Sequence, residues 1–422
     1  MPFDLLIKGG TLPDGTTADI GITGETIAAV GHLPAEAHRS IDATGDLVSP
    51  PFVDPHFHMD ATLSYGLPRI NASGTLLEGI ALWGELRATA TAEEIRDRAL
   101  AYCDWAVSMG LLAIRSHVDT TDDRLIGVEA LLDVREKVAP YLDLQLVAFP
   151  QDGLFRTETG LRNLTRALEM GVDVVGGIPH FERTMEDGAR SVRTLAELAA
   201  ERGLMLDLHC DESDDPHSRH IETLAAETLR LGLAGRAAGS HLTSMHSMDN
   251  YYVSKLLPLI AEAGIAVIPN PLINITLQGR HDSFPKRRGL TRVKELRAHG
   301  VTVGWGQDCV RDPWYSLGTA DMLDVAFMGL HVAQMTAPED MRACFAMVTD
   351  ENARILNLEG YGLYPGARAS LVVLDAGDPI EALRLRPDRL LVVSRGKVVS
   401  ERQRSRPRLT LPGRPATTDR RH

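Results

Sequence analysis

Short apolar runs, each followed by a charged stretch with helical spacing, recur through the middle of the chain. Eight such runs lie between residues 47 and 309. The stretches between them, for example 92–110 and 191–203, place apolar residues three and four positions apart and end in glycine. Parallel strands that are buried on both faces have nearly continuous apolar sequences. The pattern therefore predicts an α/β protein built on a parallel (β/α)8 TIM barrel.

The two chain ends have a different pattern, with short alternating segments separated by glycine and polar turns. We expect these segments to pair into one small β-sandwich domain beside the barrel. The predicted organisation is a first part of the β-sandwich at 1–48, the metal-dependent barrel at 49–358, a second part of the β-sandwich at 359–405 and a polar basic tail at 406–422.

Composition excludes several classes of protein. The chain has 422 residues, of which 44% are hydrophobic, and this is enough for a large core. Neither a signal peptide nor a membrane span is recognisable, so we expect a cytoplasmic protein without a membrane partner.

The four cysteines have no paired spacing, which gives no sign of a disulfide framework or a cysteine zinc site. A net charge of −13 would repel nucleic acid. A homo-oligomer is expected because large barrel enzymes often assemble.

Polar residues stand at the carboxyl ends of the predicted strands. In chain order the runs finish with His56 and His58, His117 and Asp119, Gln151, His180, His209 with Glu212, His241, Asn270, and Asp308. Barrel enzymes build their active sites at this end of the strands, whereas a barrel core uses valine, isoleucine and leucine. The strand ends therefore predict an active site.

Four of these residues have the chemistry of a metal site. His56 and His58 are two positions apart on a strand, so both face the barrel lumen. His209 and Asp308, after the fifth and eighth runs, add an imidazole and a carboxylate. Such a set binds one divalent ion and leaves a position open for water, as hydrolytic catalysis requires. The ligand types do not choose between zinc, iron and manganese.

Several longer motifs resemble a known family. "HFHMD" after the first strand, histidines on strands five and six, and "GQD" after strand eight resemble the amidohydrolase superfamily. Within it, "SGTLLEGI", "FPQDG", "DLHCDES", "SHLTS", "QGRHDSFPKRRG" and "DPWYSLG" are similar to bacterial cytosine deaminases. The resemblance runs through essentially the whole chain up to the basic tail.

The resemblance implies hydrolytic deamination of a free pyrimidine base from a salvage pool. Metal-bound hydroxide would attack ring carbon C4 and ammonia would leave, giving uracil from cytosine or thymine from 5-methylcytosine. The ligands of one Fe2+ or Zn2+ would be His56, His58, His209 and Asp308. The implied roles of the other residues are Glu212 as proton carrier, His241 as the group that orients water, Asp308 as acceptor of the water's proton, Gln151 and the Leu76 carbonyl as partners of the base, and Trp314 as a wall of the pocket.

Two positions depart from this resemblance. Cys309 follows the metal aspartate, where the cytosine deaminases have a second aspartate near ring position C5. A thiol makes this wall of the pocket more apolar and roomier than a carboxylate does. We therefore expect 5-methylcytosine to be accepted and, in the stronger form of the hypothesis, preferred over cytosine. Gln307 stands where a histidine commonly precedes the aspartate.

Two alternatives remain. The same scaffold could deaminate another amino-heterocycle, namely isoguanine, an aminotriazine or creatinine. A non-catalytic barrel scaffold is less favoured, because such proteins lose metal ligands and all four are present. A polynucleotide deaminase is excluded because the chain has no PCxxC motif.

Six other histidines fall into two groups. His117 and His180 are equally compatible with a direct role and with orienting a ligand or loop. Surface positions are expected for His217, His220, His246 and His281.

Overall fold

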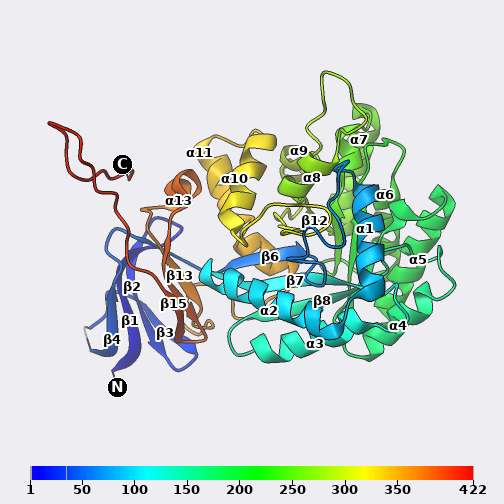
Figure 1. Cartoon of the computed structure of the whole chain (residues 1–422). Coiled ribbons are helices and arrows are strands. Elements are labelled where there is room, and N and C mark those ends of the chain that lie inside the picture. Colours follow the sequence, from blue (N-terminus) through cyan, green and yellow to red (C-terminus); the bar gives the residue numbers. More distant parts are fainter. Residues whose placement is uncertain (1, 35, 422) are drawn as a thin grey trace.

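The computed structural model describes residues 2–34 and 36–421, and its larger unit is a parallel barrel (Figure 1). Seven strands follow one another around the barrel in chain order. They are β6 (Phe52–Phe57), β7 (Leu111–Asp119), β8 (Asp143–Phe149), β9 (Val174–Gly177), β10 (Met205–Cys210), β11 (Ala237–His241) and β12 (Ala266–Ile268). This nearly closed sheet confirms the predicted barrel.

The eighth predicted strand is an extended segment, residues 301–308, and not a regular strand. It hydrogen-bonds to Val267 of β12 on one side, and Asp308 exchanges backbone hydrogen bonds with His56 and His58 on the other, at 2.7 and 3.0 Å. Between these points the Asn352 side chain donates to the carbonyls of Val53 and Trp305. A side chain thus replaces part of the strand ladder where the barrel closes.

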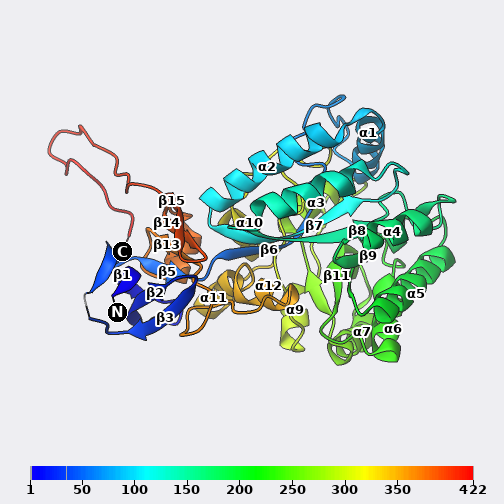
Figure 2. The same ribbon diagram turned by 90° about the horizontal axis from the view of Figure 1, so that it is seen from below.

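Helices cover the outside of the barrel (Figures 1 and 2). They are α1 (Leu76–Thr89), α2 (Ala92–Ser108), α3 (Ile126–Val138), α4 (Gly160–Glu169), α5 (Met185–Arg202), α6 (His220–Leu231), α7 (Asn250–Ala263), α8 (Pro271–Leu277), α9 (Val293–Ala298), α10 (Met322–Val332), α11 (Pro338–Ala346) and α12 (Asp350–Ile355), with 3-10 turns η1 (Pro179–Phe181) and η2 (Thr243–His246). The helices expected at 92–110 and 191–203 are α2 and α5. Thr91 and Glu94 form a capping box that starts α2, and Gly203, with φ of 66°, ends α5.

The two chain ends form a separate mixed sheet beside the barrel (Figure 2). Its order is β15-β14-β13-β5-β1-β2-β3, with β4 against β1. The bounds are β1 (Phe3–Thr11), β2 (Thr17–Thr23), β3 (Thr26–Gly31), β4 (Ala37–Asp42), β5 (Leu47–Ser49), β13 (Leu371–Leu374), β14 (Arg389–Ser394) and β15 (Lys397–Glu401), with helix α13 (Pro379–Leu385) between β13 and β14. Residues of both chain ends, such as Ile20 and Val393, share one core. The predicted joint β-domain is confirmed, with its two halves hydrogen-bonded into one sheet through β5.

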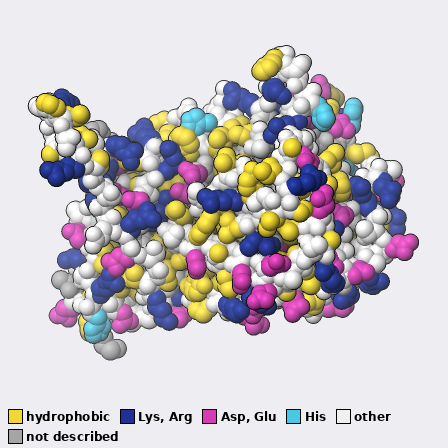
Figure 3. Space-filling model, viewed as in Figure 1, with side chains coloured by type: hydrophobic (Ala, Val, Ile, Leu, Met, Phe, Trp, Pro, Cys, Tyr) yellow, Lys and Arg dark blue, Asp and Glu magenta, His cyan; other side chains and the backbone are white. Residues whose placement is uncertain are grey.

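The C-terminal segment after β15 projects from this small sheet as an arm (Figures 1 and 3). Its base is held by ion pairs, because Arg404 and Arg421 contact Asp46 at 2.6 and 3.0 Å and Arg406 contacts Asp375 at 2.6 Å. The predicted basic tail is therefore anchored, and its last residue, His422, lies outside the described residues. Among the described helices, none is long and apolar enough to cross a membrane.

Candidate active site

The polar strand ends meet in one pocket at the carboxyl end of the barrel. It is lined by His58, Leu76, Gln151, Ile178, His209, Glu212, His241, Ile273, Leu277, Asp308, Cys309 and Trp314. Every residue to which the sequence assigns a metal, catalytic or base-binding role lines this pocket except His56, which is fully buried. The strand-end residues His117, Asp119, His180 and Asn270 do not line it. The structure thus brings the residues with an assigned role together in one place.

Four donor atoms face one another in the pocket floor. His58 Nε2 lies 3.1 Å from His209 Nε2, and Asp308 Oδ1 lies 3.4 Å from His58 Nε2 and 3.7 Å from His56 Nε2. Two atoms that each bind one ion at about 2.1 Å in a tetrahedral site are about 3.4 Å apart. Among the described residues, His56 Nε2 is buried without a hydrogen-bond partner. The spacing and this orphaned nitrogen fit one divalent cation.

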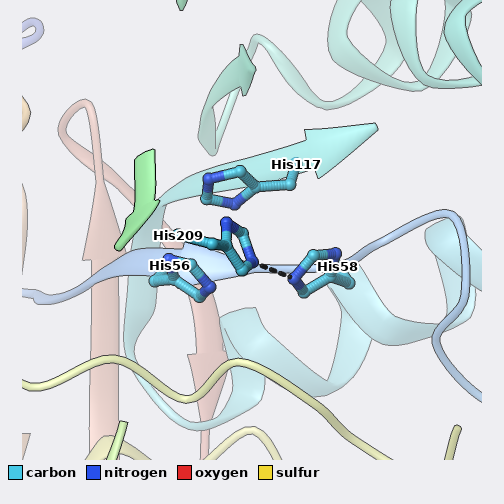
Figure 4. Close-up of side chains that lie close together, drawn as sticks. All are labelled: His56, His58, His117 and His209. Carbon is cyan, nitrogen blue, oxygen red and sulfur yellow. Dashed lines mark hydrogen bonds between the residues drawn. The ribbon is translucent and has the colours of Figure 1, made fainter. Parts of the chain in front are cut away.

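Burial controls the charge of these imidazoles. It lowers the pKa of His56, His58 and His209 well below the usual range, and the neighbouring groups, chiefly other imidazoles, lower the pKa of each further. The rings are therefore neutral and keep a lone pair for a cation. His117 of β7 joins this group, and Figure 4 shows its ring beside those of His56, His58 and His209.

His117 and His180 make backbone contacts at the strand ends. The Nδ1 atom of His117 lies 3.4 Å from the Phe57 carbonyl, between His56 and His58. The Nδ1 atom of His180 lies 2.9 Å from the carbonyl of His209. Burial lowers the pKa of His117 to about 3 and that of His180 to about 4, so both rings are neutral. Each histidine therefore contacts the backbone that carries a candidate ligand.

A buried chain of hydrogen bonds ends at His56. The Ser240 hydroxyl donates to Asp207 Oδ1 at 2.8 Å, so its oxygen accepts the Nδ1–H of His56 at 2.9 Å. Asp207 is held in turn by Arg115 at 3.0 Å, and both side chains are fully buried. Since the His56 proton sits on Nδ1, the Nε2 lone pair faces the cluster. Sequence reasoning missed this network, because its members have no characteristic spacing.

Glu212 is a buried acid at the side of the pocket. Burial, followed by the nearby charge of Asp308, raises the pKa of Glu212 well above the usual range. Its Oε1 atom lies 3.4 Å from His241 Nδ1, and His241 Nε2 lies 3.7 Å from Asp308 Oδ2. A buried carboxyl group with a raised pKa therefore lines the same pocket as the donor cluster and contacts it through His241.

One part of the pocket lining is apolar. Cys309 is 3% exposed and belongs to a cluster with Trp314, Ile273 and Leu277. Burial raises the pKa of its thiol well above the usual range, and the neutral thiol lies 3.3 Å from Asp308 Oδ1. This wall presents a small uncharged group to whatever occupies the pocket.

Trp314 is packed against helix α1. The turn that carries it is fixed because Asp312 Oδ1 accepts the backbone N–H groups of Trp314 and Tyr315, each at 2.9 Å. Gly79 of α1 lies directly under the indole, since a Cβ at this position would be 2.2 Å from Trp314 Cδ1. Leu76 at the start of the same helix lines the pocket as well, so α1 shapes this side of the site.

His220 was expected at the surface, and this prediction was wrong. Its side chain is 2% exposed, with Nδ1 2.8 Å from Asp211 Oδ1. Asp211 also accepts the Ser218 hydroxyl and the backbone N–H of Ile221, so it holds the start of α6 against the end of β10. The sequence could not reveal this, because the partner lies nine residues away across a loop.

Comparison with known proteins identifies the class. Residues 39–400 match the amidohydrolase family, so the chain belongs to that family and the predicted resemblance is confirmed. Among solved structures, 5-methylcytosine deaminase from Klebsiella pneumoniae has a TM-score of 0.92 and 43% identity, covering 95% of this chain and 98% of that one. N-isopropylammelide isopropyl amidohydrolase of Pseudomonas sp. (strain ADP) is 29% identical over 94% of this chain and 97% of its own length. Pterin deaminase of Rhizobium rhizogenes is 28% identical over 94% and 88%.

Proposed function

We propose that this protein hydrolytically deaminates a free pyrimidine base, with 5-methylcytosine preferred over cytosine. The observation that carries the proposal is one pocket that combines a donor cluster suited to a cation, the buried carboxyl group of Glu212 and the apolar Cys309 wall. The family match and the structural likeness to a 5-methylcytosine deaminase support a hydrolytic deaminase. Solved structures of that Klebsiella enzyme are liganded with 5-fluorocytosine and with phosphonocytosine, which supports a cytosine-type ring in this pocket.

His56, His58, His209 and Asp308 would hold the divalent ion. The family and the histidine-rich site support such an ion, and iron and zinc suit the donor set equally. When bound, the ion would make water acidic enough to act as a nucleophile at neutral pH. The buried, neutral imidazoles are suited to this task because they need not lose a proton first.

The remaining residues would bind the base and move protons. Asp308 would accept one proton of the attacking water, and Glu212 would give its own proton to ring nitrogen N3 as C4 is attacked. The proton of the new C4 hydroxyl would then pass through Glu212 to the departing amine, and the proton held by Asp308 would restore Glu212. Gln151 and the Leu76 carbonyl would hydrogen-bond the edge of the ring, and Trp314 would cover one side. The positions of these residues on the lining of one pocket support these roles.

Cys309 would determine the preference at ring position C5. A carboxylate there would be poorly solvated beside a methyl group, whereas a neutral thiol in an apolar cluster accepts it. Discrimination by one methyl group rarely exceeds ~200-fold, so the preference is expected to be moderate.

Deamination of another amino-heterocycle is the second candidate. The near full-length similarity to N-isopropylammelide isopropyl amidohydrolase and to pterin deaminase supports it, because those names cover a triazine and a fused ring. Both candidates use the same donor cluster and Glu212, and they differ in the shape that the pocket wall accepts.

The test is ammonia release by the purified protein, loaded separately with iron and with zinc. The substrates are cytosine, 5-methylcytosine, isoguanine and an aminotriazine. We expect the kcat/KM for 5-methylcytosine to equal or exceed that for cytosine. Clearly slower turnover of 5-methylcytosine would reject the preference, and activity confined to a triazine or a larger ring would reject the pyrimidine.

Cys309→Asp tests the determinant itself. We expect the ratio of kcat/KM for 5-methylcytosine to that for cytosine to fall by about 10- to 200-fold, because a carboxylate would face the methyl group. Cys309→Ser is the matched control, since it changes polarity with little change in size or charge and should shift the ratio less. An unchanged ratio in Cys309→Asp would show that another residue sets the preference.

A further inference from the structure

Helix α8 carries two asparagines, Asn270 at its N-cap and Asn274 one turn later, which both contact His241. Asn274 Oδ1 accepts the backbone N–H of Asn270 at 3.0 Å. A backbone N–H can only donate, so the atom that it contacts must be the oxygen of the Asn274 amide. This bond therefore fixes which end of the amide is oxygen and which is nitrogen. Its Nδ2 group must therefore be the end that faces the histidine.

The second bond fixes the histidine. Asn274 Nδ2 lies 2.9 Å from His241 Nδ1, and an amide nitrogen can only donate. Asn270 Nδ2 lies farther from the ring, at 3.3 Å from Nδ1 and 3.5 Å from Nε2, so the Asn274 contact is the shortest of the three. His241 Nδ1 must therefore accept, which leaves the ring proton on Nε2. The other neighbour of Nδ1 is Glu212 Oε1 at 3.4 Å, farther away than the Asn274 amide.

The backbone holds the ring in this place. His241 ends β11 in the left-handed region with φ of 71°, and Leu242 follows with φ of 51°. Such a conformation costs energy for a residue other than glycine and persists where the surroundings fix it. His241, Asn270 and Asn274 are each at most 1% exposed, so water does not compete for these hydrogen bonds.

We propose that Asn274 is a positioning residue that holds His241 as the Nε2–H tautomer, so that its imidazole acts as a hydrogen-bond donor toward the reacting atoms. The Nε2 atom lies 3.7 Å from Asp308 Oδ2, on the side of the candidate ligands. In this tautomer His241 cannot take a proton at Nε2, so proton transfer in the proposed reaction falls to Glu212 and Asp308. The identity of the atoms to which His241 donates rests on the proposed function. The tautomer itself does not.

The test measures the tautomer directly. Nitrogen NMR of the zinc-loaded protein, labelled with 15N in histidine, separates protonated from bare ring nitrogens, and the His241→Gln spectrum assigns the signals. We expect a protonated Nε2 and a bare Nδ1 in the wild type. A protonated Nδ1 in the wild type would overturn the proposal.

Asn274→Asp reverses the bond. A carboxylate keeps the acceptor for the Asn270 N–H but accepts from His241 as well, so the proton should move to Nδ1 or both nitrogens should be protonated. We expect kcat on the best substrate to fall by about 100-fold or more, with a smaller change in KM. Thr276→Val, on the same helix, is the control and should change neither the spectrum nor kcat.

The outcomes separate the two proposals. If Asn274→Asp leaves His241 as the Nε2–H tautomer, the positioning role is wrong whatever the substrate. If Asn274→Asp changes the tautomer as expected but the wild-type protein deaminates no pyrimidine, the proposed function fails and the positioning role stands.

Discussion

Burial sets the protonation of the residues in this pocket. Burial lowers the pKa of the three candidate ligand imidazoles and raises the pKa of Glu212, because a low-dielectric site disfavours the charged form of each. The pocket thereby favours imidazole lone pairs for a cation and the proton-bearing form of Glu212. Hydrolysis of an amidine-like bond requires both properties, because some groups must bind the ion and another must protonate the substrate.

Glu212→Gln should separate these two tasks. The amide keeps the shape of the side chain but has no proton to transfer, so we expect kcat to fall by about 10^2- to 10^4-fold. Metal content, measured by elemental analysis, should remain that of the wild type because Glu212 is not a proposed ligand. Glu227→Gln, on the outer helix α6, is the control. Loss of the metal together with activity would make Glu212 a ligand.

Ser240→Ala tests the network behind His56. Removing the hydroxyl leaves the Nδ1–H of His56 and the carboxylate of Asp207 without their shared partner. We expect zinc affinity, measured by competition with a chelator, to fall by about 10- to 100-fold. The buried Ser244, whose hydroxyl donates to the Ser218 carbonyl, gives the control Ser244→Ala. Equal zinc affinity in Ser240→Ala and Ser244→Ala would contradict the role of the network.

The sequence predicted the pocket residues that stand in recognisable spacings. His56 and His58 share a strand face, and His209, His241 and Asp308 end apolar runs, so the barrel rule brings them together. The supporting residues gave no such signal. Ser240, Asp207 and Asn274 are common polar residues, and only the folded barrel shows that they contact a histidine from another strand.

Among the elements, helix α1 and the closing segment of the barrel shape the pocket through glycine. Gly79 of α1 lets Trp314 lie against the helix, and Gly306 of the closing segment leaves space for Asn270, because a Cβ there would be 2.1 Å from its Oδ1 atom. On two sides of the site, the backbone must therefore lie close to a neighbouring side chain. Helix α1 offers a matched pair of positions, since Gly84 has no atom within 4 Å of an added Cβ.

Gly79→Ala should push Trp314 out of position. Its Cβ would lie 2.2 Å from the indole, which is packed in the pocket wall and cannot move away freely. We expect KM for the best substrate to rise by about tenfold, which corresponds to a loss of roughly 1.4 kcal/mol of binding free energy. Gly84→Ala should leave KM unchanged and stabilise the helix by about 0.5–1 kcal/mol. Equal KM in both variants would remove Trp314 from the binding site.

Most elements could be predicted from periodicity, and the closing segment shows where this fails. Its apolar run "VTVGW" has the composition of a strand, but its bonds toward β6 are partly made by Asn352, which lies about 50 residues further along the chain. Periodicity measures what one segment prefers and contains no information on which distant side chain will replace a strand neighbour.

At the scale of the whole molecule, a buried ion pair joins the small sheet to the barrel. Arg389 of β14 contacts both carboxylate oxygens of Asp321, one of them at 3.0 Å, and also donates to the Met109 carbonyl at 3.0 Å. Asp321 in turn caps α10 by accepting the N–H of Leu323. Arg389 and Asp321 are 4% and 7% exposed, so each depends on the other for compensation of its charge.

Arg389→Met should therefore destabilise the protein far more than loss of a surface pair. It leaves Asp321 buried without its cation, and we expect the free energy of unfolding to fall by about 3–5 kcal/mol. Arg39→Met, which breaks the exposed pair with Glu401, should cost less than about 1 kcal/mol. The double variant Arg389→Met with Asp321→Asn removes both charges and should recover part of the loss. Denaturant unfolding followed by circular dichroism measures all three variants. If the double variant is no more stable than Arg389→Met alone, the cost comes from lost packing around Arg389 and not from an uncompensated Asp321, because only the carboxylate differs between the two proteins.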